Sequence, residues 1–141
     1  MSELIYKDES YAIMGACFEA YKEKSCGYSE PVYHECIGIE MSLRGIPAIS
    51  KPKLQLEYKG QKLEATFEPD YVCYNKIVLE LKAVAKLIEG HRAQVLNYLK
   101  SSNMRLGLLV NFSHYPNLEW ERIVANDKWE IPAPINPDLH A

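Results

Sequence analysis

The chain has 141 residues, of which 48% are hydrophobic and 25% are charged, and its formal net charge at pH 7 is -3. This length is typical of one domain with a single hydrophobic core, which needs neither disulfides nor structural metals to fold. The small negative charge excludes a general attraction to phosphate backbones, so any nucleic-acid binding must depend on a local patch.

The apolar runs and the cysteines indicate the compartment. No apolar run approaches the roughly 18 residues that span a bilayer, and the first ten residues lack the basic start and apolar core of a signal peptide. The four cysteines include no Cys-x-x-Cys pair, which is typical of thiols in a reducing compartment. We therefore expect a cytoplasmic protein that does not enter a membrane.

Two helices are predicted at the start of the chain. Residues 8–27 carry apolar side chains near helical spacing, and Gly27 is the expected stop. Residues 29–45 follow with Ser29 as the expected N-cap, Pro31 in the first turn and Gly45 as the stop.

Strands dominate the next part of the chain. Residues 48–58, 61–74 and 76–84 alternate between apolar and polar side chains and are expected to form an antiparallel meander. A helix is then predicted over 87–103, a central strand over 105–112 and one more strand over 118–125, before a Pro-rich tail from Ile131. This order predicts one mixed α/β domain over residues 1–141, with a small sheet flanked by helices.

Two acids and a lysine interrupt the apolar run EPDYVCYNKIVLELKAV. Because side chains alternate along a strand, Glu80 and Lys82 share one face. Asp70 shares that face if residue 70 pairs with 82 and 72 with 80, which needs an odd-numbered loop such as 75–77 or a bulge. A two-residue turn would point Asp70 the other way.

Such a shared face would have a specific chemistry. The carboxylates of Asp70 and Glu80 would bind one divalent cation, which prefers hard oxygen ligands, and Lys82 would lie beside the water that the cation polarises. Such an arrangement would be able to hydrolyse a phosphodiester bond. The alternative is a solvated strand edge with a Glu-Lys pair worth about half a kcal/mol, and these three residues alone favour that alternative.

Several short motifs occur in the order found in the PD-(D/E)xK nuclease superfamily, which the chain therefore resembles. They are Pro69-Asp70, Glu80-x-Lys82 and Gln94-x-x-x-Tyr98, the last of which is similar to an element of the RecB-type exonuclease branch.

A second resemblance is more specific. Gly27-x-x-Glu30-x-x-Tyr33 is similar to the signature of the small GxxExxY protein family, which is placed in the same superfamily. Glu40 and the sequence RGI resemble the continuation of that signature. Together the motifs extend from Tyr6 to Val124.

The resemblance implies a restriction-endonuclease-like core and a Mg2+- or Mn2+-dependent nuclease acting on nucleic acid, with DNA favoured over RNA. It implies a set of metal ligands, namely Asp70, Glu80, Glu30 and the main-chain carbonyl of Leu81. It further implies that Lys82 orients or deprotonates the attacking water, and that Gln94 and Tyr98 support the lysine or hold a substrate phosphate.

Other assignments remain open at this stage. Tyr33 either reaches the site or is buried, His91 is expected at the surface, and basic residues form a modest phosphate-binding rim in one interpretation: Lys86, Arg92, Lys100 and Arg105. The second candidate function is a catalytically silent relative that binds nucleic acid or a protein partner, with self-association as a homo-oligomer left open.

Overall fold

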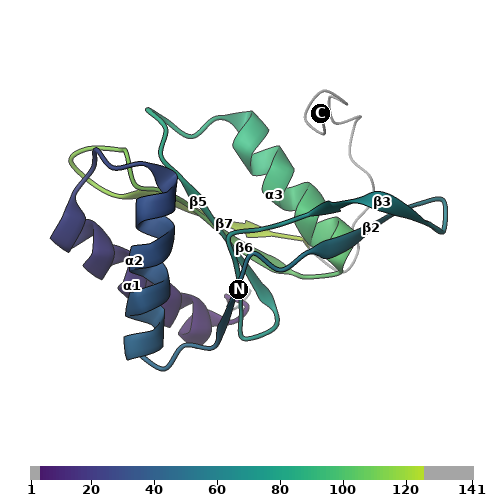
Figure 1. The fold of residues 1–141 in the computed structure, drawn as a ribbon, viewed down its shortest axis with the longest axis horizontal. Coiled ribbons are helices and arrows are strands. Elements are labelled where there is room, and N and C mark those ends of the chain that lie inside the picture. Colours follow the sequence, from purple (N-terminus) through teal and green to yellow (C-terminus); the bar gives the residue numbers. More distant parts are fainter. Residues whose placement is uncertain (1–3, 126–141) are drawn as a thin grey trace.

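The computed structural model describes residues 4–125, so the Pro-rich tail expected from Ile131 lies outside the described residues. Helices and strands follow one another along the chain as Figure 1 shows. They are α1 (Lys7–Lys24), α2 (Glu30–Leu43), β1 (Ala48–Ser50), β2 (Leu54–Tyr58), β3 (Gln61–Phe67), β4 (Tyr71–Cys73), β5 (Ile77–Lys82), α3 (Glu89–Ser102), β6 (Leu106–Asn111) and β7 (Glu119–Val124).

Five strands form one mixed sheet in the order β1-β4-β5-β6-β7. β5 and β6 run parallel, and the other neighbouring pairs are antiparallel. α1 and α2 lie on one face of this sheet and α3 lies on the other (Figure 1). The predicted fold, a small mixed sheet flanked by helices, is thereby confirmed.

β5 shows how the sheet divides the core. Ile77, Leu79 and Leu81 pack with the residues of α1 and α2, whereas Val78 packs with Val95 and other residues on the α3 side. Because side chains alternate along a strand, Glu80 also faces the α3 side. A carboxylate therefore stands in a strand that is covered on both faces.

The predicted meander is wrong in its strand count. The segment expected as one strand over 48–58 forms β1 and β2, and the segment 61–74 forms β3 and β4. Pro52 and Pro69 lie at the two breaks, where a residue without an N–H cannot continue the ladder. β2 and β3 instead pair with each other as a separate two-stranded sheet that projects from the body in Figure 1.

The helix ends lie close to the prediction. α1 ends at Lys24 rather than at Gly27, with Ser25 as its C-cap. Ser29 occupies the N-cap position of α2, although its side chain makes no capping hydrogen bond. Gly45 follows α2 with a φ of 69°, a left-handed conformation that glycine adopts without steric cost.

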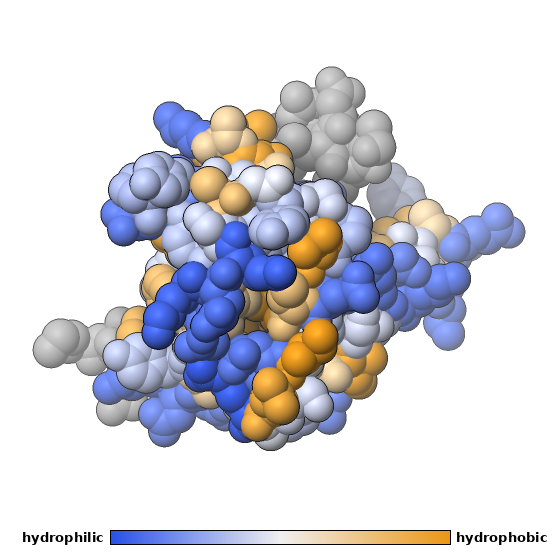
Figure 2. Space-filling model, turned by 60° about the vertical axis from the view of Figure 1, so that its left-hand side comes forward, coloured by the Kyte–Doolittle hydropathy of each residue, from blue (hydrophilic) through white to orange (hydrophobic). Residues whose placement is uncertain are grey.

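The surface mixes apolar and hydrophilic side chains. Ile39 and Leu43 of α2 and Ile49 of β1 are exposed. Figure 2 brings the left-hand side of Figure 1 forward and shows apolar side chains interspersed with hydrophilic ones. Across residues 4–125, none of the helices combines the length and the apolar composition that crossing a membrane requires.

Gly107 allows α3 to approach the sheet closely. A Cβ at this position would lie 2.6 Å from Cγ1 of the buried Val95. We expect Gly107→Ala to lower the free energy of unfolding by about 1–3 kcal/mol, because the overpacked core must shift. The control is Gly15→Ala in α1, whose Cβ would meet only the end of the Arg44 side chain, 3.1 Å away.

Gly15→Ala should raise the free energy of unfolding by about 0.5–1 kcal/mol, because alanine has a higher helix propensity than glycine. Urea denaturation measures both changes. If Gly107→Ala were neutral, α3 would not pack against β6 as closely as described.

Candidate functional site

The β4–β5 hairpin places Asp70 opposite Glu80. Its register pairs Tyr71 with Leu79 and Cys73 with Ile77, and one further step pairs residue 70 with residue 80. Residues 74–76 form the loop, and this odd number puts both carboxylates on one face. The shared face matches the prediction. The predicted pairing of 70 with 82 is wrong, because β4 ends at Cys73, before Tyr74.

Main-chain N–H groups hold both carboxylates. The N–H of Asp70 donates to Oε1 of Glu80 at 2.8 Å, and the N–H of Leu81 donates to Oδ2 of Asp70 at 2.8 Å. The N–H and C=O of one strand residue face the same neighbour. The carbonyl of Leu81 therefore also faces the side of β5 on which Asp70 lies.

Burial makes the Glu80 carboxylate difficult to ionise. The residue is only 6% exposed. Burial is the main cause that raises its pKa to about 8, and repulsion from Asp70 raises it further, whereas the Asp70 N–H and Lys82 act in the opposite direction. Nζ of Lys82 lies 4.0 Å from Oε2 of Glu80. The two carboxylates and the lysine thus form one electrostatic group.

His34 of α2 belongs to this group, and the sequence interpretation missed it. Its Nδ1 lies 3.0 Å from Oδ1 of Asp70, and its Nε2 lies 2.7 Å from Oγ of Ser50. The imidazole ring stacks on Tyr71, with ring centroids 4.3 Å apart. His34 follows Glu30 by four residues, and this helical spacing to a predicted ligand is the signal that would have found it.

Glu30 lies near the carboxylate pair without joining it. Its charge raises the pKa of Glu80, and it also acts to raise the pKa of His91, against the larger lowering by burial. Within residues 4–125, no three side chains of the types His, Cys, Asp and Glu gather in a group that could hold a metal ion. Asp70 and Glu80 are thus a pair without a third ligand side chain among these residues, and the role of Glu30 as a ligand stays a prediction.

α3 brings Tyr98 to the site. Its ring stacks on Phe67, with centroids 4.2 Å apart. Burial raises the pKa of Tyr98, and the charges of Glu80 and Asp70 raise it further, so the phenol lies within their electrostatic reach. Gln94 is half-buried one turn earlier on the same helix. Its contact with Lys82 or a phosphate stays a prediction.

His91 is partly exposed, in line with the expected surface position, and also has contacts near the site. It is half-buried, and its Nδ1 accepts a hydrogen bond of 3.1 Å from the N–H of Ile88 at the start of α3. Burial lowers its pKa, and Lys82 and Arg92 lower it further. His91 therefore lies at the edge of the site.

Two other residues that were considered for the site, Tyr33 and Arg92, make their main contacts in other parts of the structure. Tyr33 is fully buried, stacks on Phe112 at 4.6 Å and donates a hydrogen bond to the carbonyl of Ser25. Arg92, a member of the expected rim, pairs with Glu89 at 2.9 Å and Glu121 at 2.5 Å. Tyr33 supports the core, and the charge of Arg92 is largely compensated within the protein.

The donor atoms at the site fit a small, hard divalent cation. Asp70 and Glu80 offer only oxygen, and the carbonyl of Leu81 faces the same side of β5. Burial, and then the charge of Asp70, raise the pKa of Glu80, so a second negative charge is disfavoured in this buried position. A bound cation would compensate both charges.

Comparisons with known proteins identify the superfamily and the fold. The family model described as PD-(D/E)XK nuclease superfamily matches residues 7–123. The crystal structure of SSO0001 is similar to this chain, with a TM-score of 0.51 and 20% sequence identity, over 67% of this chain and 50% of that one. The chain thus spans about half the length of SSO0001, and at this identity the likeness concerns the fold alone. No curated protein sequence matches the chain.

Glu80 should make the stability of the metal-free protein depend on pH. Its folded-state pKa of about 8 lies above the ordinary value of 4.5, so the folded form keeps a proton that the unfolded form releases. The free energy of unfolding is therefore expected to fall as the pH rises from about 5 to 8. Glu80→Gln should remove a decrease on the order of 3 kcal/mol.

Chemical denaturation in EDTA at several pH values measures this decrease. Glu23→Gln, at an exposed position of α1, is the control and should retain the wild-type slope. Identical slopes for wild type and Glu80→Gln would show that Glu80 is ionised in the folded protein at neutral pH.

Proposed function

The chain belongs to the PD-(D/E)XK nuclease superfamily, and we propose that it hydrolyses phosphodiester bonds in nucleic acid, preferring DNA to RNA, with Mg2+ or Mn2+ held by Asp70 and Glu80. The observation that carries this proposal is that the main chain beside each acid binds the carboxylate of the other. Glu80 accepts a hydrogen bond from the N–H of Asp70, and Asp70 accepts one from the N–H of Leu81, the residue after Glu80.

The proposal includes finer assignments for the same chain. It is a GxxExxY protein of the RecB-like branch and forms one nuclease-like domain over residues 1–141 in the cytoplasm. The geometry of the motif supports this. Gly27 has a φ of 115°, which side chains disfavour, and the hydroxyl of Tyr33 ties the loop before α2 by accepting from the N–H of Tyr28.

Each side chain has a stated task in the proposed reaction. A cation bound by Asp70, Glu80 and the carbonyl of Leu81 would supply Lewis-acid activation of a water molecule. Nζ of Lys82 orients that water and offers positive charge to the phosphate as negative charge develops. The lysine is partly buried, with 18% of its side chain exposed, so this charge acts where solvent screening is reduced.

Residues around the pair act by positioning. His34 holds the Asp70 carboxylate at Oδ1, and Ser50 holds the other nitrogen of the imidazole. Tyr98, whose ring is fixed against Phe67, offers its hydroxyl as a hydrogen-bond donor to a substrate phosphate. Gln94 assists from the same face of α3.

Substitution at the site should separate metal binding from catalysis. Asp70→Asn and Glu80→Gln should each abolish most DNA cleavage and weaken Mn2+ binding, because a nearly isosteric amide removes a ligand charge. Lys82→Ala should abolish cleavage but leave Mn2+ affinity unchanged or higher, because a neighbouring positive charge is gone. Lys22→Ala, at an exposed position of α1, is the control and should cleave normally.

Calorimetric Mn2+ titration and a plasmid-cleavage assay measure the two properties. A wild-type protein that binds no Mn2+ through Asp70 and Glu80 would contradict the proposal. The silent relative that binds nucleic acid or a protein partner would then be the better account, and a Glu-Lys pair of purely structural use would alter stability alone.

His34 should contribute through Asp70. We expect His34→Ala to weaken Mn2+ binding by about tenfold, because partners that orient a ligand typically contribute this much. Ser50→Ala removes the outer contact only and should have a smaller effect. Calorimetry with both variants decides this, and unchanged affinity in His34→Ala would mean that the backbone alone orients Asp70.

A further inference from the structure

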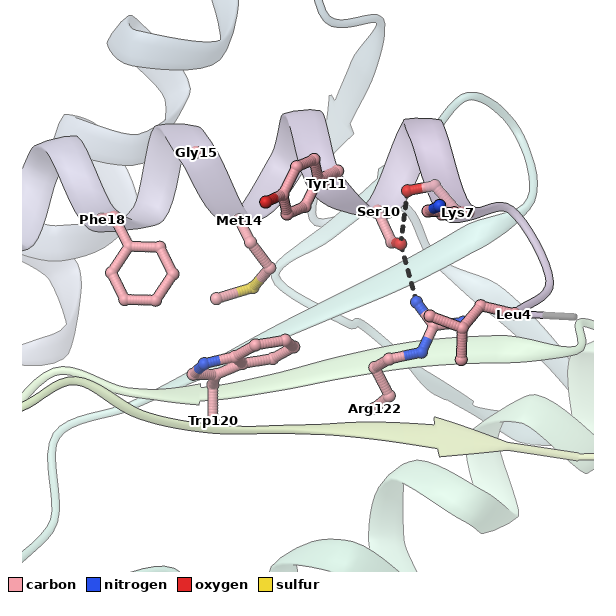
Figure 3. A pocket seen from close by; sticks show the side chains of 9 residues that line it. All are labelled: Leu4, Lys7, Ser10, Tyr11, Met14, Gly15, Phe18, Trp120 and Arg122. Atoms are coloured by element: carbon pink, nitrogen blue, oxygen red, sulfur yellow. Dashed lines mark hydrogen bonds between the residues drawn. The ribbon is translucent and has the colours of Figure 1, made fainter.

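A groove of about 640 Å³ lies between α1 and β7. Figure 3 shows its lining side chains, which come from α1, from β7 and from Leu4, just before α1. Trp120 and Arg122 point to the α1 side of the sheet, whereas Glu80 faces the α3 side. The groove is therefore separate from the candidate nuclease site. Its size is typical of sites for small molecules.

One end of the groove is aromatic. Phe18 and Trp120 meet edge to face with their ring centroids 6.4 Å apart, and they remain 46% and 37% exposed. Met14 lies between these rings and the other end of the groove in Figure 3. Large apolar surfaces are thus open to a ligand at this end, where burying them would be favourable.

The other end carries positive charge. Nη1 of Arg122 donates to Oγ of Ser10 and Nη2 donates to the carbonyl of Ile5, each at 2.7 Å. Both acceptors are neutral, and within residues 4–125 no carboxylate pairs with this guanidinium. Arg44 and Arg92, in contrast, each pair with a carboxylate. Lys7 adds a second cation to the lining, to which residues 4–125 contribute no Asp or Glu.

The sequence of β7 explains this separation of charge. In EWERIV the side chains alternate, so the two acids face α3 and Trp120 and Arg122 face α1. Glu121 pairs with Arg92 of α3, and Glu119 accepts from Asn111. The acids of the strand are therefore held on the far face and cannot compensate Arg122.

A partly buried cation without a counter-ion is unfavourable. Burial lowers the pKa of Arg122, which shows that its surroundings disfavour the charged form. An arginine nevertheless stays charged in proteins, and its planar fork matches carboxylate and phosphate oxygens. An anion in the groove would supply a negative charge to Arg122 that no carboxylate of residues 4–125 supplies.

We propose that this groove binds a small organic anion, whose carboxylate or phosphate head pairs with Arg122 and Lys7 and whose flat apolar body lies against Met14, Phe18 and Trp120. The head and the body are separate requirements. A neutral molecule of the same shape loses the contact with Arg122, and an inorganic anion loses the contact with the aromatic rings.

The test compares an acid with its neutral analogue. Calorimetry with the full chain measures the binding of 2-naphthoate and 2-naphthamide, which share one ring system. We expect the acid to bind wild type at least tenfold more tightly than the amide. Arg122→Gln should reduce this ratio to about one by weakening the acid alone, and Lys22→Gln, an exposed lysine near the end of α1, should leave the ratio unchanged.

Arg122→Gln also removes contacts with Ser10 and Ile5, so a second variant is needed in case it disturbs α1. Phe18→Ala, at an exposed position, should weaken acid and amide by the same factor and preserve the ratio. 2-Naphthyl phosphate distinguishes the two head groups, because the preferred one binds more tightly. Equal binding of acid and amide to wild type, no binding of either, or a ratio that survives both Arg122→Gln and Lys7→Gln would overturn the proposal.

Discussion

Three residues, 74–76, connect β4 to β5, and their number determines where Asp70 lies. Tyr74 and Asn75 both adopt positive φ angles, 55° and 60°, which closes the loop with a tight reversal of the chain. One residue more or fewer would turn Asp70 to the face of α1 and α2, away from Glu80. The hydrogen bonds from the Asp70 N–H to Glu80 and from the Leu81 N–H to Asp70 depend on this register, and so does the contact between Asp70 and His34.

The same hairpin places a carboxylate in the interior. β5 is covered on both faces, and Glu80 is buried between strands and α3 with a pKa of about 8. An apolar side chain at this position would avoid that cost. The fold instead spends stability on a pair of acids whose carboxylates are each held by a different main-chain N–H. This cost connects the energetics of the fold to the chemistry proposed for Asp70 and Glu80.

Local patterns made much of this predictable. Alternation along β5 put Glu80 and Lys82 on one face, and Pro31 and Gly45 marked the limits of α2. The register of β4 against β5 was not predictable, because the sequence does not show at which residue β4 ends. Only the structure shows that Cys73 is the last residue of the strand and lies in the core. His34 and Ser50 were missed for a similar reason. His34 contacts Asp70 and Ser50 contacts His34, and only the packing of α2 on β1 and β4 brings these residues together.

The central claim is that Asp70 and Glu80 hold one divalent cation. Anomalous diffraction from crystals grown with Mn2+ tests it most directly, because the signal locates the ion without reference to activity. The account predicts an anomalous peak at roughly 2.1–2.2 Å from an oxygen of each carboxylate. The N–H of Asp70 would then either no longer bond to Glu80 or donate to a lone pair that the ion does not use. A fully occupied Mn2+ site elsewhere, with the Asp70–Glu80 pair left unchanged and without metal, would contradict it.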